Sequence, residues 1–137
     1  MTGFWDDAEV ISVYTRAQAI EDGVLVDVSE IAREAGFVVP VAVTAGVWAL
    51  VEPSEQEEET WGQSVQGRLW DVLWMAWVEI RRKAGSGDEP KLLYELLFQI
   101  RGRHGERNGL RKFQLKLHSG PGDNAEHVIT IMLPNED

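Results

Sequence analysis

The sequence predicts an α+β fold, in which N-terminal helices and one long central helix pack on a C-terminal three-stranded antiparallel meander. Apolar positions recur with a helical period of about 3.6 residues as far as residue 84, and then with the period of two that is typical of strands. A turn-forming segment, residues 85–90, separates the two patterns. Helices followed by strands in this order are typical of α+β proteins, so we expect a single domain over residues 1–137.

Two helices are predicted before residue 36 from apolar spacing and from stop signals. The first runs from Asp6 to Ile20, and Gly23 ends it because glycine readily adopts the left-handed conformation that follows many helices. A short extended piece, Val24 to Asp27, leads to the second helix, Glu30 to Ala35. Ser29 is the expected N-cap of this second helix, and the glycine after Ala35 closes it.

Residues 40–51 carry signals of both a helix and a strand. Val43, Val47 and Leu50 fall on one stripe of a helix, whereas the β-branched residues of the segment favour a strand equally. We predict a helix from Pro40 to Val51, because proline is tolerated in a first helical turn but would remove a hydrogen bond from a central strand.

A long central helix is predicted from Trp61 to Ala84. Its apolar arc is wide, because the row Trp70, Trp74 and Trp77 runs beside an aliphatic face. Such a stripe is typical of a core, with a ligand slot or a partner groove as the alternatives. The helix needs cover on two sides, and any part left bare would favour a homodimer.

Three strands follow, each recognised by alternation of apolar and polar residues. They centre on Tyr94 to Ile100, Lys112 to His118 and Ile129 to Leu133. The connections contain Asn108-Gly109 and Gly120-Pro121-Gly122-Asp123, which suit tight turns. Short links between successive strands predict an antiparallel meander. A phosphate-binding loop is not predicted, because no Lys and Ser/Thr opening a helix follow the glycines.

Composition excludes several classes of function. The absence of cysteine excludes disulfides, thiol nucleophiles and thiolate metal sites. The longest nearly apolar run, residues 37–51, is shorter than the roughly 20 residues that span a bilayer. No secretory signal peptide is recognisable in the sequence, so we expect a cytoplasmic protein that does not enter a membrane.

Charge is unevenly distributed along the chain. Residues 1–60 hold thirteen Asp/Glu against only Arg16 and Arg33, whereas residues 61–137 are nearly balanced, and the net charge is −10. The negative electrostatic field of such a chain repels nucleic acid as a direct ligand and attracts basic surfaces. A basic protein surface is therefore the expected partner.

Three stretches resemble a known family. They are Tyr14-Thr15-Arg16-Ala17-Gln18-Ala19-Ile20-Glu21-Asp22-Gly23-Val24-Leu25-Val26-Asp27-Val28-Ser29, the segment from Gly36 to Trp48, and the ending from Gly120 to Asp137. Together they resemble the DUF6573 family of uncharacterised bacterial proteins. The resemblance implies an accessory product of a plasmid, phage or other mobile element, and it implies no particular activity.

Four residues form the candidate ligand site: Tyr14, Arg16, Asp22 and Asp27. Carboxylates clustered near Asp22 and Asp27 could bind a hard cation, but their spacing differs from that of an EF-hand, and capping of neighbouring helices accounts for them as well. The simplest role of Arg16 is an ion pair with a nearby acid. We therefore predict no metal site and no cofactor.

Histidines and basic residues give weaker signals. His118 and His127 could join Asp123 in a metal site, but strand parity places the two histidines on opposite faces. The basic connection that contains Arg103 and Arg107 could be a solvated loop, a contact with acidic residues or a phosphate-binding patch.

The leading hypothesis is a small acidic accessory protein that binds a basic protein surface, with an anti-defence or regulatory role. Its candidate contact residues are Glu55, Glu57, Glu58, Glu59, Arg103 and Arg107. The alternative is an enzyme or ligand-binding protein with a pocket between the long helix and the sheet, and with Tyr14, Arg16, Asp22 and Asp27 at the mouth of that pocket. No residue set meets the geometric tests for an active site, so no catalytic residue is assigned.

Overall fold

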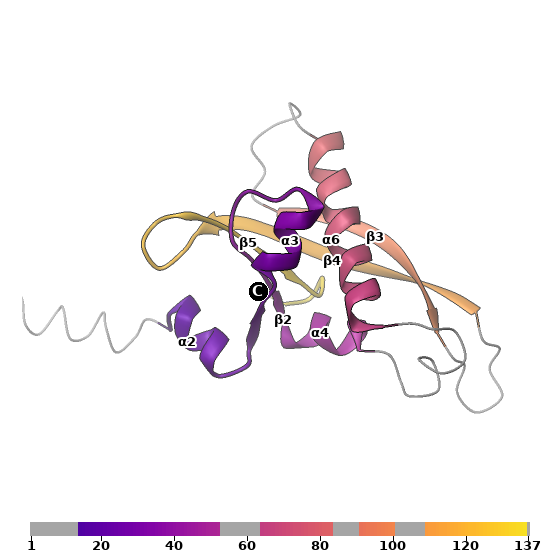
Figure 1. Cartoon of the computed structure of the whole chain (residues 1–137), viewed down its shortest axis with the longest axis horizontal. Coiled ribbons are helices and arrows are strands. Elements are labelled where there is room, and N and C mark those ends of the chain that lie inside the picture. The colour runs from indigo at the N-terminus through magenta and orange to yellow at the C-terminus, as the bar shows by residue number, and fades with distance from the viewer. Residues whose placement is uncertain (1–13, 53–63, 84–90, 101–108, 137) are drawn as a thin grey trace, which may run out of the picture.

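The computed structural model describes residues 14–52, 64–83, 91–100 and 109–136 (Figure 1). These residues form helices and a mixed five-stranded sheet. In chain order the elements are α2 (Arg16–Glu21), β1 (Leu25–Asp27), α3 (Ser29–Ala35), β2 (Val41–Thr44), α4 (Ala45–Val51), α6 (Val65–Arg82), β3 (Lys91–Ile100), β4 (Gly109–Pro121) and β5 (His127–Met132). The α+β class predicted from the sequence is confirmed.

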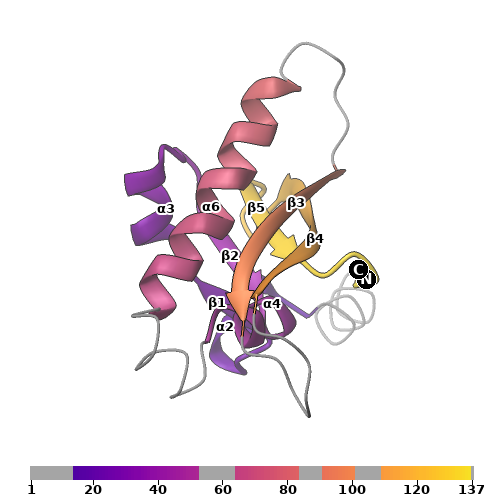
Figure 2. The same ribbon diagram turned by 90° about the vertical axis from the view of Figure 1, so that its right-hand side faces the viewer.

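The sheet has the strand order β1-β2-β5-β4-β3, with β2 and β5 parallel and every other pair antiparallel. Helices α3 and α6 lie side by side on one face of it (Figure 2). The core lies between these layers, where Val43, Ile131 and Leu117 occupy neighbouring positions of three adjacent strands. Full burial of each such side chain contributes about 1.5–3 kcal/mol.

The predicted three-stranded meander is only part of the sheet. Strands β3, β4 and β5 do pair antiparallel in succession, but β5 also pairs with β2, and β2 pairs with β1. The prediction missed this extension because residues far apart in the chain form the parallel pair, for example Val43 with Ile131. Local alternation carries no information about such a partner.

The sequence predicted a single helix over residues 40–51, but this prediction is wrong. The segment forms a strand followed by a helix. Pro40 immediately precedes β2, so its missing N–H removes nothing from the ladder, while its carbonyl accepts a 2.9 Å hydrogen bond from the Ile129 amide. Thr44 then ends the strand and caps α4, its hydroxyl accepting a 3.2 Å bond from the Val47 amide. Burial of β2 between β1 and β5 selects the strand from two balanced propensities.

The first predicted helix does not run through Thr15. Helix α2 begins at Arg16, because Thr15 and Gln18 form a capping box with bonds of 3.0 and 2.9 Å. The predicted part before Tyr14 lies outside the described residues. Gly23 ends the helix at a φ of +79°, so the predicted glycine stop is confirmed.

Helix α3 begins one residue earlier than predicted. Ser29 is its first residue and not its N-cap, and the Ser29 hydroxyl instead accepts a 3.0 Å bond from the Val41 amide. Gly36 ends this helix at a φ of +117°, as predicted. A side chain at Gly36 would also collide with the ring of Trp77, so α3 and α6 approach closely there.

Helix α6 is the central core element that the sequence indicated. Ser64 caps it by accepting a 3.0 Å bond from the Gly67 amide, so the described helix starts after the predicted Trp61. Buried Arg68 donates to the Leu50 carbonyl at 3.2 Å and links α6 to the end of α4. In the part of the chain that the structure describes, no helix combines the length and apolarity needed to span a bilayer.

Candidate functional site

Arg16 is anchored to the sheet on the face opposite α6. Its guanidinium donates to the Thr130 hydroxyl at 2.7 Å and to the Ile129 carbonyl at 2.9 Å. Partial burial lowers the pKa of Arg16, while the charges of Asp27, Asp123 and Glu126 oppose that shift. Arg16 therefore sits among carboxylates, as an ion-pair role requires, but its direct hydrogen bonds go to β5.

Asp123, in the turn between β4 and β5, holds the start of α2. Its carboxylate accepts from the Arg16 amide at 2.7 Å and from the Ala17 amide at 3.0 Å. These N–H groups have no partner inside the helix, and they lower the pKa of Asp123 by stabilising its charged form. We call Arg16, Asp123, Ile129 and Thr130 the Arg16 network.

Tyr14 and Asp22 are brought together at the two ends of α2. The Tyr14 hydroxyl donates to the Asp22 carboxylate at 2.5 Å, and this bond raises the pKa of Tyr14. Both residues are exposed, and Asp27 bonds to the Ser29 hydroxyl at 2.6 Å. The four predicted ligand-site residues thus lie around α2 and β1, where each has a partner within the chain.

A different part of the molecule contains a pocket. It has a volume of about 500 Å³ and lies between α6 and β3, the layers between which the sequence placed its alternative binding site. Seven residues line it: Asp71, Trp74, Met75, Glu95, Leu96, Leu97 and Lys112. We call this pocket the edge groove. None of Tyr14, Arg16, Asp22 and Asp27 lines it.

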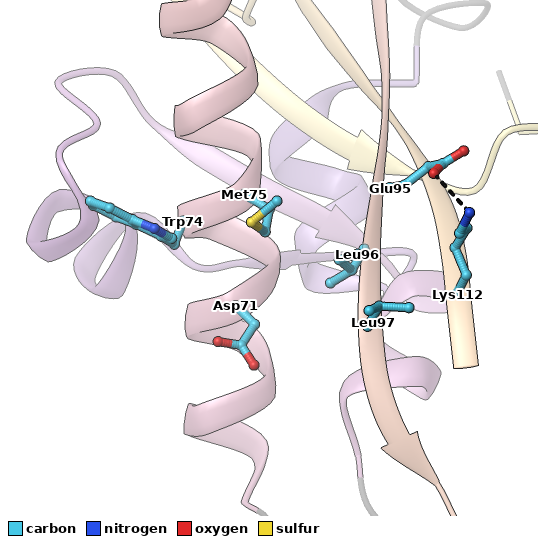
Figure 3. Close-up of a pocket in the computed structure, with 7 residues that line it drawn as sticks. All are labelled: Asp71, Trp74, Met75, Glu95, Leu96, Leu97 and Lys112. Carbon is cyan, nitrogen blue, oxygen red and sulfur yellow. Dashed lines mark ion pairs between the residues drawn. The ribbon is translucent and has the colours of Figure 1, made fainter. Parts of the chain in front are cut away.

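The lining residues show that the edge groove follows the free side of β3. Leu96 points toward α6, whereas its neighbours Glu95 and Leu97 lie on the other side of the strand (Figure 3). Successive side chains of a strand point to opposite faces, so one pocket reaches all three only around the edge of the sheet. Strand β3 occupies such an edge, because it is last in the strand order.

The two walls of the edge groove, α6 and β3, are joined by a hydrogen bond. The Tyr94 hydroxyl, on β3, donates a 3.1 Å bond to the Val72 carbonyl on α6, and burial raises the pKa of Tyr94. On the other face, Lys112 on β4 pairs with Glu95 at 3.5 Å. The spacing between α6 and β3 is therefore set by a buried hydrogen bond beside the groove.

Asp71 is the exceptional side chain of the edge groove. Among the described residues it has no hydrogen-bond or ion-pair partner, while Glu95 in the same groove is paired. Asp71 is exposed, but partial burial raises its pKa, which means that its charged form is somewhat less well solvated than that of a free carboxylate. A carboxylate in this state favours an incoming cationic group.

The tryptophan row is only partly core. Trp70 and Trp77 pack against the core, but the exposed Trp74 stacks between them, with ring centroids 6.2 and 5.3 Å apart. Arg81 lies 4.9 Å above the Trp77 ring. The ring faces therefore contact one another and Arg81, and the Trp74 ring points away from β3 (Figure 3).

Other predicted contact residues lie outside the described part of the chain. These are Glu55, Glu57, Glu58, Glu59, Arg103 and Arg107. His127 is described, and its imidazole contacts the Ser119 hydroxyl at the end of the β4–β5 hairpin. Within the described ranges, no three His, Asp or Glu side chains are grouped to hold a metal ion.

Comparison with known proteins identifies the family. A family model described as a family of unknown function, DUF6573, matches residues 1–137. The chain belongs to the DUF6573 family. Comparisons of this DUF6573 chain with curated proteins and with solved structures found no match. Its function therefore has to be argued from the edge groove and the charge distribution.

The sequence predicted a pocket between the long helix and the sheet, but it missed the residues that line the edge groove, although part of their signal was present. Leu93 and Leu97 give β3 a second apolar face, which a strand needs only when something covers that face. Asp71 gave no signal, since an acid on the polar side of a helix usually faces solvent. The groove requires α6 and the sheet edge to be placed together, and only the structure does this.

Proposed function

We propose that this protein is a binding module that docks a basic segment of another protein in the edge groove. The observation that carries the proposal is that Asp71, an exposed but partly desolvated carboxylate, has no partner among the described residues and lines a mainly apolar groove. A lysine or arginine of the partner would supply the missing charge. Met75, on the same helix as Asp71, would pack against its aliphatic stem.

Long-range charge supports the same partner class. The net charge of −10 attracts basic proteins and accelerates their association, and the groove then provides the local contacts. In the setting that the family resemblance implies, a mobile-element accessory protein in the cytoplasm, such docking would compete with nucleic acid for basic surfaces. This competition is the anti-defence or regulatory role that we propose.

The proposal is tested by titrating the full chain with peptides as long as β3, made of alternating lysine and valine or of alternating glutamate and valine. We expect only the lysine peptide to bind in calorimetry, with an affinity that falls between about 50 and 300 mM salt as screening increases. The substitution Asp71→Asn should weaken binding about tenfold, equivalent to about 1.4 kcal/mol.

Glu34→Gln is the matched control. Glu34 is an exposed carboxylate on α3 that does not line the groove, so its removal changes the net charge by the same amount. A larger effect of Asp71→Asn than of Glu34→Gln supports docking in the groove. Equal effects of the two variants, or no binding of the lysine peptide, would contradict the proposal.

A further inference from the structure

Strand β3 is long, and none of the strands that the structure describes pairs with its outer side. It covers ten residues, pairs with β4 along one side, and has no strand partner on the other side within the described part of the chain. An edge strand presents alternate N–H and C=O groups that a further strand can bind. Proteins usually protect such edges, so an open edge beside a groove calls for an explanation.

The shape of the edge groove matches an added strand. A neighbouring strand would lie about 4.8 Å from β3, in the plane of the sheet, with its side chains alternating between the two faces. The groove already has this form, because it reaches Leu96 on one face and Leu97 on the other. It is therefore built for an extended chain and not for a helix laid on one face.

We propose that β3 binds its partner by strand addition, as the sixth strand of the sheet. This inference rests on the proposed function and specifies the form of the basic segment. On the α6 side, the added strand would carry lysine or arginine opposite Asp71. On the other side it would carry aliphatic residues beside Leu93 and Leu97, which are 48% and 53% exposed.

Charge selects a basic strand of another protein over a second copy of this chain. Two β3 strands related by a two-fold axis perpendicular to the sheet would pair antiparallel and form one continuous sheet. The α6-facing sides of the two copies would then lie on the same face of that sheet. The copy would then present Tyr94 and Leu96, which belong to the core under α6, and Leu92, which shares their strand parity, on the α6 side. None of them supplies a cation to Asp71.

The test compares two peptides of identical composition and charge. One alternates lysine and valine, and the other carries all its lysines in one block and all its valines in the next. Only the alternating peptide separates the two residue types onto the two faces of a strand. We expect it to bind at least tenfold more tightly, and its binding to slow hydrogen exchange of β3 amides in the full chain.

Backbone pairing is tested by methylating the amide nitrogens of the alternating peptide one at a time. Methylation at positions of one parity should weaken binding at least tenfold, because only alternate residues bond to the neighbouring strand. Equal affinity for both peptides, without protection of β3, would overturn strand addition and leave basic-segment docking intact. Failure of both peptides to bind would instead refute the proposed function.

Leu97→Lys gives an independent check from the protein side. Leu97 is exposed, so the variant should fold. The new lysine should lose the apolar contact with the aliphatic residues of the added strand and repel its net positive charge, which should reduce affinity at least tenfold. Val38→Lys is the control, because Val38 is 96% exposed outside the groove and gains the same charge. Equal losses in the two variants, or a free protein that dimerises through β3, would overturn the proposal.

Discussion

The Arg16 network and the edge groove both place charged groups against the sheet, yet they treat those groups in opposite ways. In the Arg16 network, the guanidinium bonds to Thr130 and Ile129, and Asp123 accepts from two amides of α2. In the edge groove, Asp71 has no such partner among the described residues. The charged groups of the first region are satisfied within the chain, whereas we propose that Asp71 of the second region is paired by a basic residue of a partner.

This difference separates a structural role from a binding role. Charged groups that find partners within the chain stabilise the fold, and their removal exposes unsatisfied polar atoms. A partly desolvated charge without a partner instead lowers the stability of the isolated protein, as binding sites often do. The sign of the stability change on substitution therefore distinguishes the two regions.

The largest effect is expected for Arg16→Ala. The substitution removes two hydrogen bonds of a half-buried cation, so the free energy of unfolding should fall by about 1–3 kcal/mol. Arg16→Lys should recover only part of this, because a lysine keeps the charge but not the two-donor geometry. Urea unfolding measures the free energy of unfolding of both variants. An unchanged midpoint for Arg16→Ala would show that the Arg16 network does not stabilise the fold.

Asp123→Asn should have a smaller, pH-dependent effect. The amides of Ala17 and Arg16 hold the pKa of Asp123 below its usual value, so its carboxylate stabilises the native state above a pH of about 4. That contribution is lost as pH falls through the lowered pKa. Wild type should unfold at higher urea than Asp123→Asn at pH 7, and the gap should close in acid. A gap that persists unchanged in acid would exclude this linkage.

Elements set by local signals were predictable from the sequence. The tryptophan-rich helix α6 followed from its period, and the ends of α2 and α3 followed from Gly23 and Gly36. Strand β2 did not, since the local propensities of residues 41–44 are balanced and the decisive partner is β5, far along the chain. Tertiary pairing decided between two structures that the local sequence permitted.

The site was predictable only where its residues are close in sequence. Tyr14, Arg16 and Asp22 lie near one another because all three belong to α2 or its flanks, and Tyr14 bonds to Asp22, but their role as a ligand site stays a prediction. Asp123 was not linked to them, since it lies 107 residues after Arg16 and approaches only through the β4–β5 turn. Asp71 was missed for the same reason, because its surroundings come from β3.

The smallest stability effect, and the one of opposite sign, is expected for Asp71→Asn. Partial burial raises the pKa of Asp71, so its contribution to stability is full below a pH of about 4 and is lost as pH rises through the raised pKa. At pH 7 the ionised side chain therefore opposes folding. Asp71→Asn should unfold at slightly higher urea than wild type, by less than about 1 kcal/mol given the exposure of the site.

This gain in stability should disappear in acid, where the Asp71 side chain of the wild type is as neutral as the asparagine of the variant. Glu34→Gln should give no gain in stability at either pH. Peptide affinity should change in the opposite direction, since the same carboxylate that weakens the free protein is the proposed anchor for a basic residue. A variant that gains stability and loses binding separates the edge groove from the Arg16 network. If Asp71→Asn instead lowered stability, Asp71 would have a structural partner, and the contrast between the two regions would be wrong.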